Sequence, residues 1–244
     1  MKIFAFIPAR YQSTRFPGKP LALIAGKPMI QHVYERALLC PELFEVYVAT
    51  DHERISDCVH GFGGKVMMTK KAHHSGTDRI SEAAIKIGLK KQDIIVNIQG
   101  DQPLFDPSVI TLLIKPLVED ESIPMSTLSW KITDDNQVRN PNHVKVVTDN
   151  QGFALYFSRS PIPCFRDAGP GKKYYKHLGF YGYRMEFLTR FTSLSQGELE
   201  SAEKLEQLRA LEHGFKIKVM ETPFNSVEVD VPEDIKTVET IIQG

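Results

Sequence analysis

The 244-residue chain has few cysteines, no excess charge of either sign and no long apolar run. Its three cysteines, Cys40, Cys58 and Cys164, are too few and too irregularly spaced for a disulfide framework or a structural zinc site, which favours a reducing compartment. Thirty basic residues balance thirty acidic ones, so no overall field attracts nucleic acid or an anionic membrane. The apolar start at 3–7 is broken by Pro8 and is too short for a signal-peptide core or a membrane span. We therefore expect a soluble, cytoplasmic protein that attracts anions only locally.

Two common phosphate-binding motifs are also missing. Neither GxxxxGK[ST] nor GxGxxG occurs, which argues against an ATPase P-loop and against a dinucleotide-binding Rossmann site. No internal repeat or low-complexity tract interrupts the chain. What remains is a sequence in which strand-like and helix-like segments alternate, and this alternation predicts an α/β sheet with helices on its faces.

The expected elements fall into two groups. Up to about residue 120, we expect strands at 3–7, 46–50 and 94–99 and helices at 28–40, 53–60, 77–87 and 107–118. Beyond it, we expect antiparallel strands at 125–132, 144–148 and 154–158, a helix at 201–213, strands at 216–220 and 226–229, and a last helix at 232–242. The pattern predicts a single domain over 1–244 with a small lobe at about 125–190.

A glycine- and proline-bearing loop, PARYQSTRFPGK at 8–19, directly follows the first expected strand. It carries Arg10, Arg15 and Lys19, and Ser13 adds a hydroxyl donor. In an open α/β sheet, ligands bind outside the carboxyl ends of the strands. Each charge-assisted hydrogen bond to a phosphate contributes roughly 1.5–3 kcal/mol. The loop therefore predicts a polyphosphate site; the alternative is a solvated basic loop with ordinary turn residues.

Two carboxylates stand where apolar strands are expected to end. Asp101 lies in QGDQP at 99–103, after the best candidate for a central strand, and Asp230 lies in VEVDVPE at 227–233. Magnesium in nucleotide sites is held by one or two carboxylates together with substrate phosphates, so this pair predicts a magnesium site. The alternatives are a turn residue for Asp101 and a helix cap for Asp230. Sequence spacing does not show that the two side chains meet.

A further cation, Arg79, is expected in the first turn of a helix, in the segment SGTDR at 75–79. A cation there opposes the helix dipole, while an anion bound at that helix start would be favoured. Arg79 is therefore a candidate nucleotide contact, and an exposed surface arginine is the alternative.

The chain shares six ordered blocks with one enzyme family. The blocks are the loop at 10–19, SGTDR at 75–79, QGD at 99–101, YKHLGFYGYR at 175–184, LEQLRALEHG at 205–214 and VEVDVPED at 227–234. Over essentially its whole length the chain resembles the 3-deoxy-manno-octulosonate (KDO) cytidylyltransferases, or CMP-KDO synthetases. The resemblance implies a Rossmann-like nucleotide-diphospho-sugar transferase fold, with a mixed, mostly parallel central sheet flanked by helices and a small β-containing dimerisation lobe. It also implies a homodimer that makes CMP-KDO and diphosphate from CTP and KDO for lipopolysaccharide biosynthesis.

The same resemblance implies roles for particular residues. Those that would bind the nucleotide are Arg10, Ser13, Arg15, Lys19, Ala49, Thr50, Asp51, Arg79 and Asp101. Those that would bind the sugar are Gln99, Arg159, His177, Tyr181, Glu206 and Gln207. The cofactor would be Mg²⁺, held by Asp101 and Asp230, and these two would act in catalysis with Lys19 and Arg15. One departure from the family pattern is Gln102, where glutamate is usual, so metal affinity or pH dependence could differ.

Part of the sugar site also follows from strand geometry. His177, Gly179 and Tyr181 alternate along an expected strand and so share one face, with Gly179 leaving room between the two rings. The alternatives are interior roles for His177 and Tyr181 and a solvated helix face for Glu206 and Gln207.

Several functions remain open at this point. One is a cytidylyltransferase for a related acid sugar, either 8-amino-KDO or sialic acid. Others are a nucleotidyltransferase with another substrate pair and a non-catalytic nucleotide-sensing module. The neutral charge and the lack of a basic stripe disfavour a nucleic-acid binder.

Overall fold

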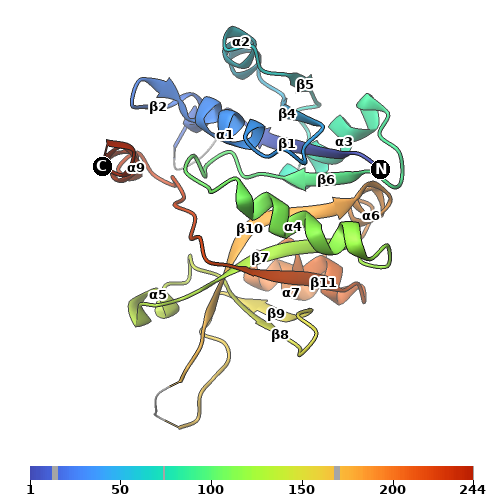
Figure 1. The fold of residues 1–244 in the computed structure, drawn as a ribbon, viewed down its shortest axis with the longest axis vertical. Helices are drawn as coiled ribbons and strands as arrows, with labels where there is room; N and C mark the ends of the chain where they lie inside the picture. The colour runs from blue at the N-terminus through green and yellow to red at the C-terminus, as the bar shows by residue number, and fades with distance from the viewer. Residues whose placement is uncertain (13–15, 74, 168–170, 244) are drawn as a thin grey trace.

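The computed structural model describes residues 1–12, 16–73, 75–167 and 171–243. A twisted sheet runs through the middle of the molecule (Figure 1). The first strand, β1 (Ile3–Ala9), lies in its interior, parallel to β6 (Ile94–Asn97) on one side and to β4 (Glu45–Thr50) on the other. The short strand β5 (Val66–Met68) continues the parallel part beyond β4.

The second half of the chain extends the same sheet. Strand β10 (Tyr175–Arg184) is antiparallel to both β6 and β7 (Met125–Lys131), and β11 (Ile217–Thr222) is parallel to β7. The hairpin of β8 (Lys145–Thr148) and β9 (Ala154–Ser158) joins at β10, which confirms the antiparallel pairing expected there. The predicted mixed, mostly parallel sheet is confirmed.

Helices cover both faces of the sheet, as predicted. The helices of the described ranges are α1 (Met29–Leu38), α2 (Glu53–Gly61), α3 (Gly76–Ile87), α4 (Ser108–Glu119), α5 (Asp135–Arg139), α6 (Met185–Phe191), α7 (Glu198–Glu203), α8 (Leu208–Glu212) and α9 (Asp234–Gln243). Alternate residues of β1 supply two separate cores: Ala5 and Ile7 pack with α1 and α4, while Phe4 and Phe6 pack with α3 and α6. None of the helices in the described ranges has the length and apolarity that a bilayer span requires.

The start of α3 matters for the cleft described below. Ser75 caps the helix, because its hydroxyl accepts a 3.1 Å hydrogen bond from the Asp78 amide. The helix ends at Gly88, whose φ of 76° is a left-handed conformation that glycine adopts without strain. Both ends lie where the sequence predicts them.

The single helix expected at 201–213 is wrong. The chain forms α7 and α8 instead, and Lys204 between them has a left-handed φ of 54°. Arg209 of α8 forms a bidentate ion pair with Glu200 of α7, with distances of 2.8 Å from Nε and 2.6 Å from a terminal nitrogen. The break places the residues between the two helices in a turn.

The strand expected at 226–229 is also wrong, because that segment has no regular structure. Its Val229 amide donates a 2.9 Å hydrogen bond to the Asp101 carbonyl. The last helix, α9, begins only at Asp234, whose carboxylate accepts hydrogen bonds from the amides of Asp230 and Val231. The Asp234 carboxylate therefore stabilises this turn. The two-stranded sheet of β2 (Leu23–Ile24) and β3 (Lys27–Pro28) and the 3-10 helix at Lys19–Leu21 were not expected.

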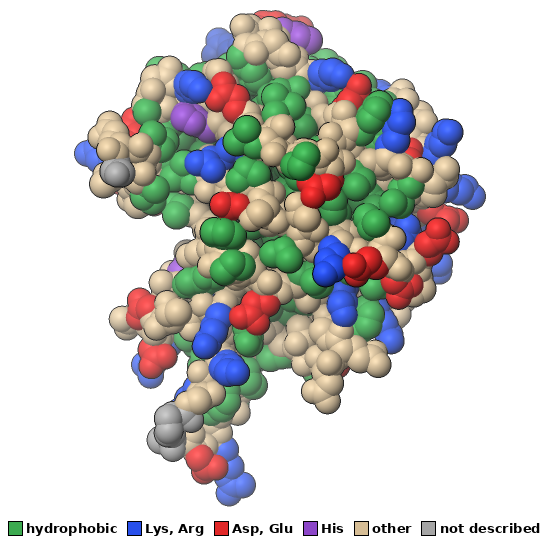
Figure 2. Space-filling view, in the orientation of Figure 1, with side chains coloured by type: hydrophobic (Ala, Val, Ile, Leu, Met, Phe, Trp, Pro, Cys, Tyr) green, Lys and Arg blue, Asp and Glu red, His purple; other side chains and the backbone are tan. Residues whose placement is uncertain are grey.

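The outline of the molecule is uneven. In the space-filling view it is hollowed between the part that carries α9 and β2 and the part that carries α5, β8 and β9 (Figure 2). Between β9 and β10, the described residues 159–167 and 171–174 extend away from the body of the sheet (Figure 1).

Candidate active site

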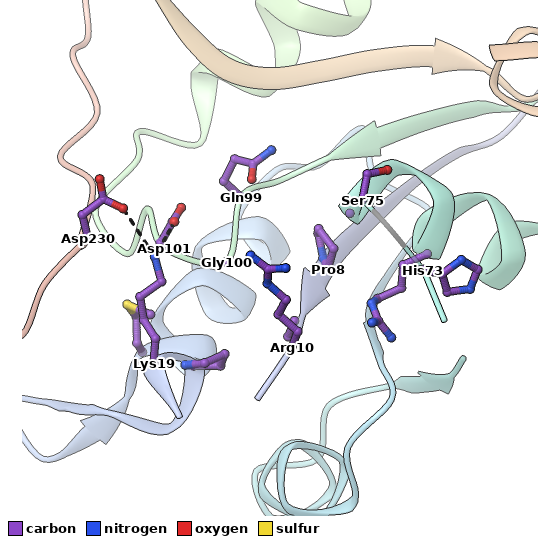
Figure 3. Close-up of a pocket in the computed structure, with 14 residues that line it drawn as sticks. Pro8, Arg10, Lys19, His73, Ser75, Gln99, Gly100, Asp101 and Asp230 are labelled. Atoms are coloured by element: carbon purple, nitrogen blue, oxygen red, sulfur yellow. Dashed lines mark hydrogen bonds and ion pairs between the residues drawn. The ribbon is translucent and has the colours of Figure 1, made fainter. Parts of the chain in front are cut away.

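A cleft of about 370 Å³ opens at the carboxyl ends of β1 and β6 (Figure 3). The end of β1, the 3-10 helix, the start of α3 and the turn after β6 form its walls. Six of the predicted site residues line it: Arg10, Lys19, Arg79, Gln99, Asp101 and Asp230. The sequence argument that the basic loop and Asp101 share one rim of the sheet is therefore confirmed.

Lys19 is the centre of one wall of this cleft. Its ammonium lies 2.7 Å from an Asp101 oxygen and 3.7 Å from an Asp230 oxygen, and it donates a 2.9 Å hydrogen bond to the Val229 carbonyl (Figure 3). The fold thus brings together the two carboxylates whose meeting the sequence spacing left open. Arg10, which directly follows β1, reaches the same space and is exposed.

Asp101 and Asp230 fit a magnesium ion in the chemistry of their donors. Both are carboxylates, both are partly exposed to the cleft, and both face a cation in the present structure. In the described part of the chain no group of three or more acidic, histidine or cysteine side chains is placed to form a complete cage. Two carboxylates that share a metal with substrate phosphates and water match the usual magnesium arrangement in nucleotide sites.

Arg79 is buried rather than exposed, with 5% of its surface accessible. Its guanidinium donates a 2.5 Å hydrogen bond to the Thr69 hydroxyl and lies 3.4 Å from an Asp51 carboxylate oxygen. These partners offset the unfavourable placement of a cation in the first turn of α3. Arg79 therefore ties the end of β4 to α3 and lines the cleft at the same time.

Gln99 connects the cleft to β10. Its side-chain amide donates a 2.9 Å hydrogen bond to the Gly179 carbonyl. A Cβ added to Gly179 would lie 3.4 Å from the Gln99 side chain, which is ordinary contact. The expected gap between the rings of His177 and Tyr181 is wrong: the ring centroids are 5.4 Å apart, and the strand pairing is irregular between residues 178 and 181. The two rings are neighbours on one face because of that irregularity.

His177 is a buried, neutral histidine. The Thr127 hydroxyl donates to the Phe180 carbonyl at 2.7 Å, so the His177 Nε2, 2.9 Å from the same hydroxyl, is the donor in that pair. Nδ1 then carries the lone pair and can accept a hydrogen bond. Burial, with a smaller contribution from the Lys176 charge, lowers the pKa of His177 to about 3.

Tyr181, Glu206 and Gln207 complete this second cluster. The Tyr181 hydroxyl donates a 3.0 Å hydrogen bond to the Gln207 side-chain oxygen, and burial raises the pKa of Tyr181. Glu206 accepts a 2.6 Å hydrogen bond from the Thr77 hydroxyl, and burial raises the pKa of its carboxyl. The Glu206 Oε1 and the Gln207 side-chain nitrogen are buried without a hydrogen bond to any described residue, although Arg209 lies 3.8 Å from that Glu206 oxygen. A second, open hollow that contains Glu206 shares Ser75 with the first cleft.

Three other predicted residues lie away from the cleft lining. Ala49 and Thr50 are buried in β4, and the Thr50 carbonyl accepts a 2.8 Å hydrogen bond from the Thr69 amide. The Arg159 guanidinium donates to the carbonyls of Glu203 and Pro141, at 2.7 and 3.0 Å. In this structure Arg159 therefore anchors the end of α7. Ser13 and Arg15 lie outside the described residues.

The sequence interpretation missed a second lysine and acid pair. Lys176 is buried on β10, and its ammonium lies 3.6 Å from an oxygen of Glu228. The Gln102 amide donates to that oxygen at 3.4 Å, so Gln102 contacts Glu228 and does not line the cleft. Burial, with the nearby charges of Asp101 and Asp230, raises the pKa of Glu228, while Lys176 opposes the shift. A lysine in the middle of the strand-like run YKHLGF is the signal that could have revealed this pair.

The fold is an α/β sheet flanked by helices, and its cleft gathers acidic and basic groups at the carboxyl ends of β1 and β6. The sequence model of one family, described as cytidylyltransferase, matches residues 4–218. The chain belongs to the cytidylyltransferase family.

Close relatives cover the whole chain. A 3-deoxy-manno-octulosonate cytidylyltransferase from Desulfatibacillum aliphaticivorans is 53% identical and spans 100% of this chain and 99% of its own length. An 8-amino-3,8-dideoxy-manno-octulosonate cytidylyltransferase from Shewanella sediminis is 54% identical and spans 98% of each chain. Overall identity therefore does not separate the two sugars.

Solved structures agree with the fold. A CMP:2-keto-3-deoxy-manno-octonic acid synthetase complexed with CTP superimposes with a TM-score of 0.94 at 43% identity, covering 100% of this chain and 99% of the other. A 4-diphosphocytidyl-2C-methyl-D-erythritol synthase from Anaerococcus prevotii, 14% identical, shares the fold with a TM-score of 0.62 over 100% of this chain and 99% of its own. The predicted nucleotidyltransferase fold is confirmed.

Proposed function

We propose that this chain transfers CMP from CTP to KDO and releases diphosphate. The observation that carries the proposal is the convergence of Asp101 and Asp230 on Lys19 in the wall of the cleft, at 2.7 and 3.7 Å. The 43% identity to a synthetase solved with CTP and the 53% identity to relatives named for KDO support this substrate pair. The chain is then an enzyme that activates an acid sugar.

The nucleotide would occupy the cleft. Arg10 and Lys19 would bind the triphosphate, because both cations line this space, and Ser13 and Arg15 would join them from the same loop. The base would lie towards Ala49, Thr50 and Asp51 at the end of β4, with Arg79 beside the nucleotide. The ion pair of Arg79 and Asp51 supports this orientation because it links α3 to the end of β4 at that side of the cleft.

Asp101 and Asp230 would hold Mg²⁺ together with the phosphates of the substrate. When bound, the metal would neutralise part of the triphosphate charge and polarise the reacting phosphate. Lys19 stands next to both carboxylates and would stabilise the departing diphosphate. The chain itself supplies no covalent nucleophile in this scheme.

The sugar would lie against β10 and the turn between α7 and α8. The His177 Nδ1 lone pair can accept a hydrogen bond from a sugar hydroxyl, and the unsatisfied atoms of Glu206 and Gln207 provide further partners. Gln99 would contact the sugar from the cleft side, and Arg159 its carboxylate. The anomeric hydroxyl would attack the α-phosphorus in line with the departing diphosphate, so positioning dominates catalysis.

This arrangement makes a histidine base unnecessary. A pKa of about 3 makes His177 a poor proton acceptor at neutral pH, whereas it remains a good hydrogen-bond acceptor. The proton of the attacking hydroxyl would leave to solvent. His177 is then a sugar ligand rather than a general base.

A second candidate substrate is 8-amino-KDO. Relatives named for that sugar are 54% identical to this chain, as similar as those named for KDO. An acceptor panel separates the candidates: purified protein, CTP and Mg²⁺ are incubated with KDO, 8-amino-KDO or sialic acid, and the CMP-sugar is identified by mass. We expect CMP-KDO. A product formed only with 8-amino-KDO or sialic acid would replace the substrate, and CTP binding without any product would leave a nucleotide sensor.

We also propose a compartment and an oligomeric state for this reaction. CTP is an intracellular nucleotide, so we place the reaction in the cytoplasm, where CMP-KDO would supply lipopolysaccharide biosynthesis. We also propose a homodimer of single-domain subunits in which the lobe at about 125–190 contributes to the sugar site and the subunit contact. Sedimentation equilibrium tests the dimer: a monomer at micromolar concentration would refute it.

A further inference from the structure

Asp230 lies in a segment without regular structure, between β11 and α9. The amide, the carbonyl and the side chain of its neighbour Val229 each have a contact. The Val229 amide donates to the Asp101 carbonyl at 2.9 Å, and the Val229 carbonyl accepts from Lys19, also at 2.9 Å. The Val229 side chain is fully buried in a small core with Ile24. After Val229, the Asp230 amide donates to the Asp234 carboxylate at 2.7 Å; before Val229, Glu228 contacts β10.

Lys176 provides such a contact from β10. With 5% of its surface accessible it is a buried lysine, and among the described residues Glu228 is the carboxylate that pairs with it, at 3.6 Å. A buried ammonium is strongly disfavoured without a carboxylate partner. Gln102 donates to the same Glu228 oxygen at 3.4 Å. Glu228 is therefore held on β10 and on the turn that carries Asp101.

Charge balance gives the pair a second effect. Glu228 and Asp230 flank Val229, whose amide is bonded to the Asp101 carbonyl, so three acidic residues belong to this one turn contact. Lys19 contacts two of them and Lys176 the third. Removing either Lys176 or Glu228 breaks the link between β10 and the segment that carries Asp230.

We propose that the Lys176–Glu228 ion pair positions Asp230 beside Asp101, so that β10 and the metal-binding segment are held as one unit. The inference rests on the proposed function, because it takes Asp101 and Asp230 as the magnesium ligands. Lys176 precedes His177 on β10, so one strand would carry both a sugar contact and the anchor of the metal site. Neither Lys176 nor Glu228 lines the cleft, so both would act as positioning residues.

The test measures metal binding directly. Mn²⁺, which replaces Mg²⁺ as a paramagnetic probe, is titrated into the protein with CTP and no sugar, and free Mn²⁺ is followed by electron paramagnetic resonance. We expect Lys176→Met and Glu228→Gln each to weaken Mn²⁺ binding by about tenfold, the usual effect of losing a group that orients a metal ligand. The double variant should lose about as much as either single variant, because both changes remove one interaction.

The matched control is Glu186→Gln, which breaks an exposed ion pair with Lys91 at a similar separation of 3.8 Å. It should leave Mn²⁺ binding unchanged. Wild-type Mn²⁺ affinity in both single variants, with only a lower melting temperature, would overturn the proposal, and so would additive losses in the double variant. Because no sugar is present, a failure of wild-type protein to convert KDO would refute the proposed function without changing this result. A wild-type protein that binds no Mn²⁺ with CTP would overturn the metal assignment and this inference together.

Discussion

The ammonium of Lys19 and the carboxylate of Asp101 form a 2.7 Å hydrogen bond in the cleft wall, although 82 positions separate them in the sequence. The same ammonium lies 3.7 Å from Asp230, so one lysine contacts acidic residues from two distant parts of the chain. The pair explains how the carboxylates stay close together despite their mutual repulsion. It also places a cation where the phosphates of a nucleotide would lie.

Replacing Lys19 by methionine should weaken CTP binding by about tenfold to a hundredfold, since one charge-assisted hydrogen bond contributes roughly 1.5–3 kcal/mol. Isothermal titration with CTP and Mg²⁺ measures the effect. Lys27→Met is the matched control, because Lys27 pairs with Glu35 on the exposed surface. Equal CTP affinities for the two variants would contradict the role of Lys19.

Removing Arg209 should destabilise the fold. Glu200 and Arg209 are 6% and 12% exposed at their side chains, and the loss of one partner from a buried pair costs about 3–5 kcal/mol. Urea unfolding of Arg209→Met should show that loss, while Lys115→Met, from an exposed helix pair, should change stability by less than about 0.5 kcal/mol. Similar stabilities for both variants would mean that the ion pair does not hold α7 against α8.

The prediction of one helix at 201–213 failed because the break between α7 and α8 depends on contacts that the local sequence does not show. The run at 201–213 has helical composition, and nothing in it marks Lys204 as a left-handed residue. The break depends on an ion pair between Glu200 and Arg209, which a local pattern does not reveal. In contrast, α3 was predicted well because its signals, Ser75 before the first turn and Gly88 after the last, are local.

The state of His177 predicts a pH effect on stability. Its pKa is about 3 in the folded protein and near 6.5 when unfolded, so between these values the unfolded chain binds more protons. The free energy of unfolding should therefore fall as pH decreases from 6.5 to 5, by about 1.1 kcal/mol per pH unit on average from this residue alone. His177→Gln, which retains a donor for Thr127, should reduce the slope between pH 6.5 and 5 by that amount. Identical slopes in urea unfolding would show that His177 titrates normally in the fold.

Gln102 also supports a prediction, because its amide donates to Glu228. Gln102→Glu would place a second carboxylate against Glu228 at a site with 1% exposure, and we expect a loss of about 1–3 kcal/mol at pH 8. The loss should be smaller at pH 5. Repulsion raises the pKa of these carboxyls in the folded protein, so one of them takes up a proton at a higher pH than it does in the unfolded chain, and the repulsion is relieved. Urea unfolding at both pH values measures it, and an equal loss at pH 5 and pH 8 would be inconsistent with charge repulsion.

The candidate site was predictable only in part. Arg10, Lys19, Arg79, Asp101 and Asp230 were candidates because they stand in the loop after the first strand, in the first turn of a helix or after strand-like runs, whereas Gln99 was a candidate only through the family resemblance. All six line the cleft. The Lys176–Glu228 pair was missed because a buried charge inside a strand and an acid in an irregular segment leave no periodic signal. Contacts between segments that are far apart in the chain can be seen only in the folded structure.

The most direct test of the central claim is diphosphate release from CTP, Mg²⁺ and KDO by wild-type protein and by Asp101→Asn. The variant keeps the size of the side chain but removes one of the two carboxylates beside Lys19. We expect KDO-dependent release by the wild type and a loss of at least about a hundredfold in the variant, because the metal would lose a ligand in a step dominated by charge stabilisation. Wild-type rates in Asp101→Asn, or no KDO-dependent release by the wild type, would contradict the account.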